Sequence, residues 1–115
     1  MYEQNKPWLN EKGELHSWLT ITAEGAVVRL KKPVKVLGDA NGEGATSVDR
    51  LILRSPTIRD SRGAAKQAAG DLEEQELILF ANLAGISIKD LEGLQEVDYK
   101  RVTAAYFRLV YDDGL

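Results

Sequence analysis

The chain has 115 residues, of which 43% are hydrophobic and 29% are charged, and its net charge at pH 7 is −3. This size and composition predict a single globular domain and exclude a disordered chain. Because there is no cysteine, disulfides, thiolate metal sites and cysteine nucleophiles are also excluded. The chain lacks an apolar run of about 20 residues, and its polar N-terminus does not resemble a signal peptide, so we expect no membrane contact and a cytoplasmic location.

The first half of the chain carries the alternating apolar pattern of β-strands. Residues 1–14 are polar and predict an arm, followed by one domain at residues 15–115. Within residues 15–54 the strand signals fall at His16–Thr22, Ala26–Leu30, Val34–Val36 and Ser47–Arg54. Pro33 lacks a backbone N–H, which predicts an edge position or a bend. We therefore expect a small antiparallel sheet of three or four strands.

After residue 54 the apolar period changes to about 3.6, which is typical of helices. Ser55 as N-cap and Pro56 as the first helical residue predict a helix that stops at Gly70. Its inner stripe would consist of Ile58, Ser61, Ala65 and Ala68. Three more helices are predicted at Asp71–Gly85, Ser87–Leu94 and Asp98–Tyr111. Strands followed by three or four helices over residues 55–111 predict an α+β fold.

Metal and catalytic sites are poorly supported by the side chains present. Asp39, Asn41 and Glu43 resemble the first half of a calcium-binding loop, but the twelfth position, where a glutamate is required, is Arg50. A hairpin loop is the preferred interpretation of this segment. His16 is the single histidine and has no serine or carboxylate at a diagnostic spacing, so we expect a solvated side chain. We predict neither a cofactor nor an enzyme activity.

Basic residues gather around the joint between the last strand and the first helix. Arg50 and Arg54 share a strand face, and Arg59, Arg62 and Lys66 follow at helical spacing. A small DNA-binding regulator would use such a stripe. However, no aromatic residue lies between residues 19 and 79, and the acidic net charge also disfavours nucleic acid. We prefer a structural joint in which Arg54 and Arg59 add a contact to a protein partner.

The C-terminal helices carry more apolar surface than a chain of this size is expected to bury. The helix Asp71–Gly85 is apolar around most of its circumference, and the last helix adds a cluster of aromatic residues. A contact with another polypeptide would explain the excess. The expected partner-binding residues on these helices are Leu79, Leu83, Tyr106, Phe107, Val110 and Tyr111.

The order of these features resembles a known family. The motifs are Leu30-x-x-Pro33-Val34, Leu51-x-Leu53-Arg54-x-Pro56-Thr57-x-x-Asp60, Leu83-Ala84-Gly85-Ile86-Ser87 and Leu91-x-x-Leu94-x-x-x-Asp98-Tyr99. In this order and spacing, across residues 26–111, they resemble the tail assembly chaperones of Mu-like and related contractile-tailed phages and prophages. Residues 1–25 lie outside the resemblance.

The resemblance implies a small, non-enzymatic assembly factor of the host cytoplasm. Such a protein is expected to bind the tape measure protein and hold it soluble until tail tube protein polymerises around it. A homo-oligomer is compatible with this role. The alternative interpretations are a structural tail or baseplate component and the DNA-binding regulator considered above.

Overall fold

The computed structural model describes residues 6–36 and 46–111. Over these residues, three antiparallel strands are followed by four helices, which confirms the predicted α+β class. The strands are β1 (Leu19–Thr22), β2 (Gly25–Val36) and β3 (Thr46–Leu53), in the spatial order β1-β2-β3. The helices are α1 (Ile58–Ala68), α2 (Leu72–Ala84), α3 (Ile88–Glu92) and α4 (Glu96–Val110).

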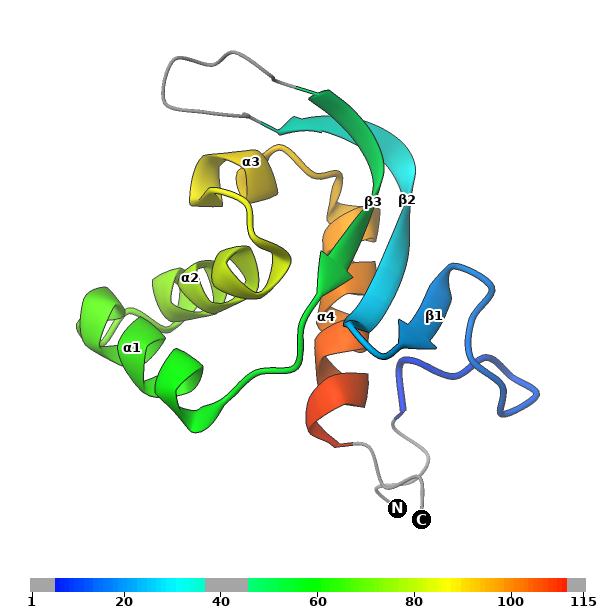
Figure 1. Cartoon of the computed structure of the whole chain (residues 1–115), viewed down its shortest axis with the longest axis horizontal. Coiled ribbons are helices and arrows are strands. Elements are labelled where there is room, and N and C mark those ends of the chain that lie inside the picture. Colours follow the sequence, from blue (N-terminus) through cyan, green and yellow to red (C-terminus); the bar gives the residue numbers. More distant parts are fainter. Residues whose placement is uncertain (1–5, 37–45, 112–115) are drawn as a thin grey trace.

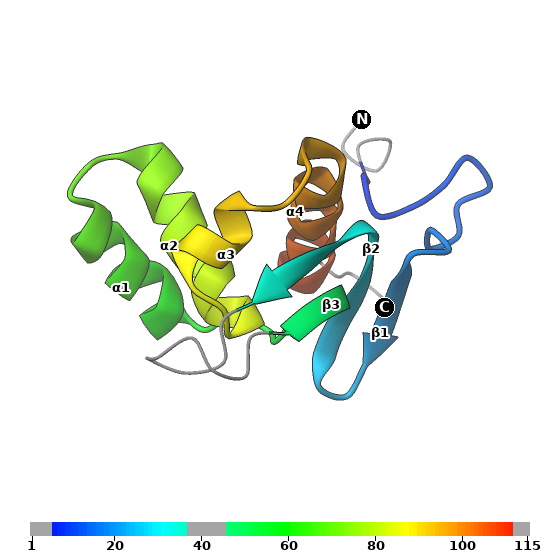
Figure 2. The same ribbon diagram turned by 90° about the horizontal axis from the view of Figure 1, so that it is seen from above.

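The helices lie on one face of the sheet. Figures 1 and 2 show α4 lying along the sheet, α1 and α2 forming a hairpin to one side, and α3 between this hairpin and the strands. The strand residues facing the helices are buried, among them Val28 in β2 and Leu53 in β3. Ile52, one residue before Leu53, points to the other face and is 47% exposed. The core therefore fills the space between one sheet face and the helices.

The central strand β2 confirms the predicted irregularity at Pro33 and excludes the alternative of an edge position. The strand runs from Gly25 to Val36, but its pairing with β3 is interrupted between Arg29 and Val34, where the register shifts. Because β2 is the central strand, Pro33 is accommodated by this irregularity and not by an edge position. Within this irregular stretch, the backbone N–H groups of Lys31 and Lys32 donate to the carboxylate of Asp98 in α4.

The segment before the sheet differs from the predicted strand over His16–Thr22. The structure begins β1 at Leu19, because the Leu19 N–H donates to the His16 carbonyl and closes a turn there. His16 is half-buried and stacks on Trp18, with ring centroids 4.8 Å apart, so the expectation of a solvated histidine was wrong. Trp8, within the predicted arm, is only 7% exposed and contributes to the core.

The helix caps mostly follow the sequence. Asp71 caps α2, and Ser87 forms a reciprocal capping box with Asp90 at α3, as predicted. The cap of α1 was predicted wrongly, because Thr57 and not Ser55 is the N-cap. The Asp60 N–H donates to the Thr57 hydroxyl, and the Asp60 carboxylate accepts the Thr57 backbone N–H. Ser55 cannot form this reciprocal pair, because the residue three positions after it is Ile58.

The inner face of α1 also differs from the predicted stripe. Ala64 and Ala68 are buried, while Ala65 is exposed and Ile58 is 78% exposed. Alanine recurs along this helix at positions that fit more than one face, so the periodicity alone could not orient it. The packing of α1 against α2 selects Ala64 and Ala68 because these small side chains, one turn apart, allow the two helices to approach closely.

Candidate protein-interaction surfaces

The joint between β3 and α1 is held by an ion pair with a structural role. The Arg54 guanidinium donates to both oxygens of Asp60, at 2.7 and 2.9 Å, and Thr57 donates to the same carboxylate. The Arg54 backbone N–H also donates to the Leu83 carbonyl at the end of α2. Arg54 therefore connects β3, α1 and α2. Its guanidinium, followed by the Thr57 backbone N–H, holds the pKa of Asp60 well below its ordinary value.

Replacing Arg54 by methionine is expected to flatten the acid dependence of stability. Because the folded-state pKa of Asp60 is depressed, its ionised form stabilises the fold above about pH 4, and this contribution is lost as the pH falls toward the folded value. The destabilisation caused by Arg54→Met should therefore be largest at neutral pH and shrink on acidification. Thermal unfolding from pH 7 to about pH 3 measures it.

The matched control for this experiment is Arg50→Met. Arg50 pairs with Asp49 at 3.2 Å, but both side chains are more than 60% exposed. Because an ion pair so exposed contributes little, Arg50→Met should leave the pH profile unchanged. If both substitutions shift the profile equally, the Arg54–Asp60 pair is not the cause.

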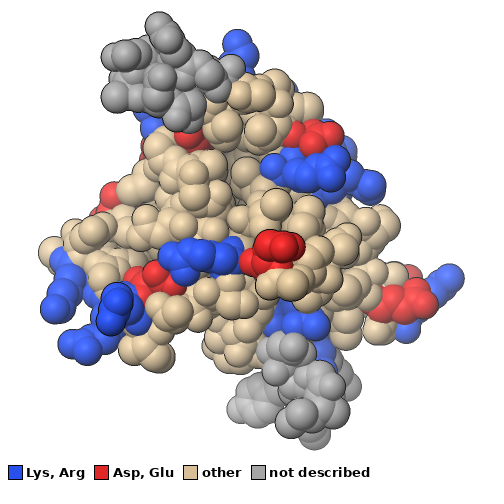
Figure 3. Space-filling view, in the orientation of Figure 1, with Lys and Arg blue, Asp and Glu red and all other residues tan. Residues whose placement is uncertain are grey.

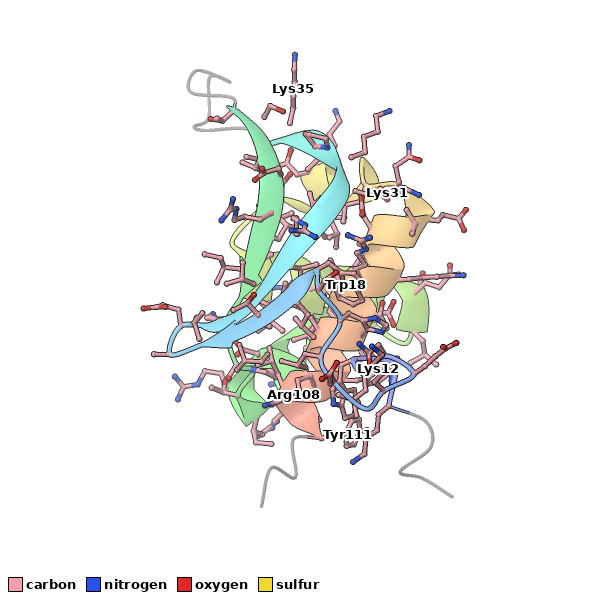
Figure 4. The ribbon with its side chains drawn as sticks, turned by 90° about the vertical axis from the view of Figure 1, so that its right-hand side faces the viewer. Lys12, Trp18, Lys31, Lys35, Arg108 and Tyr111 are labelled. Atoms are coloured by element: carbon pink, nitrogen blue, oxygen red, sulfur yellow. The ribbon has the colours of Figure 1, made fainter. Side chains whose placement is uncertain are left out.

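A chain of aromatic side chains runs from the core to the surface along α4. Phe80 of α2 contacts Tyr106 with ring centroids 5.0 Å apart, and Tyr106, Phe107 and Tyr111 follow at successive separations of 5.8 Å. Exposure rises along this chain from 2% at Phe80 to 61% at Tyr111, and Val110 beside it is 42% exposed. Figure 4 shows Tyr111 at the C-terminal end of α4, far from Lys35 at the other end of the molecule.

The structure places the predicted partner-binding leucines apart from this surface. Leu79 and Leu83 are only 7% and 2% exposed, and both belong to the main core. Tyr106 and Phe107 are half-buried against the core. The exposed apolar surface of the predicted set is therefore confined to Val110 and Tyr111, with partial contributions from Tyr106 and Phe107.

A basic face lies on the outer side of α1. Ile58, Arg59, Arg62, Gly63 and Lys66 line a shallow depression there, on the side opposite the buried Ala64 and Ala68. Figure 3 shows Lys and Arg side chains projecting from the lower left of the molecule, where Figure 1 places α1. Among the described residues, Arg59, Arg62 and Lys66 have no carboxylate partner, whereas Arg50 and Arg54 of the predicted stripe are paired. We call this surface the basic face.

A groove with an acidic rim lies between α2, α3 and α4. Its volume is about 570 Å³. Leu77, Leu91, Leu94 and Tyr99 are its buried or half-buried apolar residues, and the exposed charged residues around them are Glu73, Glu76, Glu92, Glu96 and Lys100. The Tyr99 hydroxyl donates to Glu76 at 2.6 Å, and burial, assisted by this carboxylate, raises the pKa of Tyr99. We call this surface the acidic groove.

The sequence indicated the charges of the acidic groove but not the groove itself. Acidic residues dominate the segment from Asp71 to Asp98, and spacing along each helix assigns most of them to outer faces. Their convergence around Leu77 and Leu94 depends on how α2, α3 and α4 pack, because the three helices are separated in sequence by turns. No local signal in the sequence specifies that packing.

The described ranges contain neither a cluster of metal ligands nor a helix able to span a membrane. Residues 6–36 and 46–111 contain no cluster of three or more side chains able to ligate a metal. Among the helices of these ranges, none has the length and apolar character needed to cross a bilayer. The loop that resembles half of a calcium site, at Asp39–Gly44, lies outside the described residues.

Comparison with known families identifies the class of protein. The family model described as phage tail assembly chaperone proteins, E, or 41 or 14, matches residues 27–110. This match covers most of β2, all of β3 and all four helices. The chain therefore belongs to this family of phage tail assembly chaperones. Neither the curated proteins nor the solved structures contain a significant match to it.

Proposed function

We propose that this chain binds the tape measure protein and keeps it soluble in the host cytoplasm during tail assembly, without catalysing a reaction. Membership of the tail assembly chaperone family supports a role in assembly through a protein partner. The tape measure protein is the partner that the family likeness suggests, and its release would accompany polymerisation of tail tube protein.

The observation that carries this proposal is the exposed apolar end of α4. Val110 and Tyr111 are 42% and 61% exposed, and the Tyr111 ring contacts the half-buried Phe107. Apolar side chains exposed side by side at a helix end form a surface on which an apolar stripe of another helix can pack. Burying one large apolar side chain contributes about 1.5–3 kcal/mol. Two such side chains give a weak contact, which suits a chaperone that must leave its partner.

Co-expression with the tape measure protein tests the proposal. We expect the wild-type chain to raise the soluble fraction of the tape measure protein and to copurify with it. The double substitution Val110→Ser and Tyr111→Ser should reduce the copurified amount by about tenfold or more, because it removes two or more kcal/mol of apolar contact. The matched control is Ile52→Ser, which removes an exposed apolar side chain on the outer face of the sheet.

Two outcomes would contradict the proposal. A tape measure protein whose solubility is unaffected by this chain would remove the chaperone role. Equal losses with Ile52→Ser and with the double substitution would show that the end of α4 is not the contact surface. Mass spectrometry of purified phage particles separates the remaining alternative, because a structural tail component persists in the finished particle and an assembly chaperone does not.

A further inference from the structure

The basic face of α1 and the acidic groove are complementary in charge, and each also presents apolar side chains. The basic face carries three cations, Arg59, Arg62 and Lys66. The acidic groove carries four glutamates and Lys100, so its net charge is −4 + 1 = −3. The basic face also presents Ile58, which is 78% exposed, and the groove offers Leu77 and Leu94 beneath its charged rim.

We propose that these two surfaces bind each other in different copies of the chain, so that α1 of one copy lies in the acidic groove of the next. Ile58 would pack on the groove leucines, while Arg59, Arg62 and Lys66 would face the glutamates of the rim. The contact would bury an apolar residue that its own chain leaves uncovered, and the opposite charges would set its orientation and its partner choice.

The two surfaces cannot meet within one molecule. The basic face lies on the side of α1 opposite Ala64 and Ala68, which are buried on the side where α1 packs against α2. The acidic groove begins on α2 and extends through α3 to α4. Figure 2 shows α1 at one edge of the molecule and α4 on the far side of α2. In the proposed contact, each surface is therefore covered by a second copy.

Because the two surfaces are different, their contact is heterologous. A copy bound through its basic face still presents a free acidic groove. Its partner, bound through the acidic groove, still presents a free basic face. Association of this kind adds copies head to tail until the rotation closes a ring, or continues as an open series. The contact leaves Val110 and Tyr111 unused, so it does not depend on the proposed binding of the tape measure protein.

Reversal of charge on each surface tests the contact. In the first variant, Arg59 and Arg62 are replaced by glutamate, and in the second, Glu73 and Glu92 are replaced by arginine. Each variant alone would bring like charges together, so its dissociation constant for self-association should rise at least about tenfold. Sedimentation velocity over a concentration series measures the constant, and added salt should weaken the wild-type association because the charges are exposed.

Mixing the two variants provides the decisive measurement. The second variant keeps a native basic face and the first keeps a native acidic groove, so these two surfaces can form the native contact in a mixture. The reversed face of the first variant and the reversed groove of the second are also opposite in charge and can form a second contact. Association should therefore return in the mixture although neither variant associates alone. The matched control replaces Lys31 and Lys35, exposed cations of β2, by glutamate, with the same change in net charge as the first variant.

Several outcomes would overturn the inference. These are a wild-type chain that is monomeric at every concentration, reversed variants that associate like the wild type, or a mixture that remains monomeric. Loss of tape measure copurification in the second variant, with a monomeric wild type, would assign the groove to that partner instead. Circular dichroism should show that all variants remain folded, since the replaced side chains are exposed.

Discussion

Replacing Asp98 by alanine is expected to lower the free energy of unfolding by about 3–5 kcal/mol. Asp98 is completely buried near the start of α4, and its two oxygens accept the backbone N–H groups of Lys31 and Lys32 at 2.7 and 3.0 Å. These two donors lie in the stretch of β2 where the pairing register shifts. Without the carboxylate they lose their partner in a part-buried environment, and α4 keeps its attachment to β2 through the Arg101 guanidinium and the Arg29 carbonyl but loses the one through Asp98.

Chemical denaturation followed by circular dichroism measures this cost. Asp71→Ala is the matched control, because Asp71 is exposed and accepts a single backbone N–H at the start of α2. Loss of that cap should cost about 1 kcal/mol. Asp98→Asn should fall between the two, since an amide keeps one acceptor but presents N–H groups to the second donor. An Asp98→Ala cost no larger than that of Asp71→Ala would refute the structural role of this carboxylate.

The attachment at Asp98 also bears on the proposed function. Asp98 fixes α4 to β2, and the same helix carries Val110 and Tyr111 at its other end. A chain that is only partly destabilised by Asp98→Asn should therefore lose tape measure copurification in proportion to the unfolded fraction. Val110→Ser with Tyr111→Ser should instead lose copurification while the free energy of unfolding changes little, because both side chains are largely exposed.

Replacing Gly25 by alanine is expected to destabilise the fold by at least about 3 kcal/mol. Gly25 has a φ of +139°, in a region that side chains rarely adopt. An added Cβ would also overlap the carbonyl oxygen of Leu53, a backbone atom that cannot move without disturbing the pairing of β2 and β3. Both effects act where the turn from β1 enters the central strand.

Gly13→Ala separates the two contributions at Gly25. Gly13 also has a positive φ, +79°, but a Cβ there would meet no atom within 4 Å. Its substitution should cost about 1–2 kcal/mol from backbone strain alone. The difference between the two variants in thermal or chemical unfolding then reports the overlap with Leu53 together with the more extreme φ of Gly25. Equal costs would show that β2 and β3 adjust to the side chain without loss.

The interaction surfaces were only partly predictable. The sequence predicted an apolar excess on the C-terminal helices, but Leu79 and Leu83 are core residues, so the exposed apolar surface of the predicted set centres on Val110 and Tyr111. Helical periodicity shows that a residue lies on an apolar face and does not show whether another element covers that face. In α2, which is apolar on most sides, the sheet and the neighbouring helices provide the cover.

The α+β class, the approximate positions of the elements and most helix caps could be read from the sequence, because they depend on residue period and on hydrogen bonds between residues three apart. The role of Asp98, the orientation of α1 and the existence of the acidic groove became visible only in the tertiary structure. Each of these depends on atoms that are distant in the chain, such as Asp98 and Lys31, 67 residues apart. Local patterns carry no information on which distant groups will meet, since close packing of the whole core decides that.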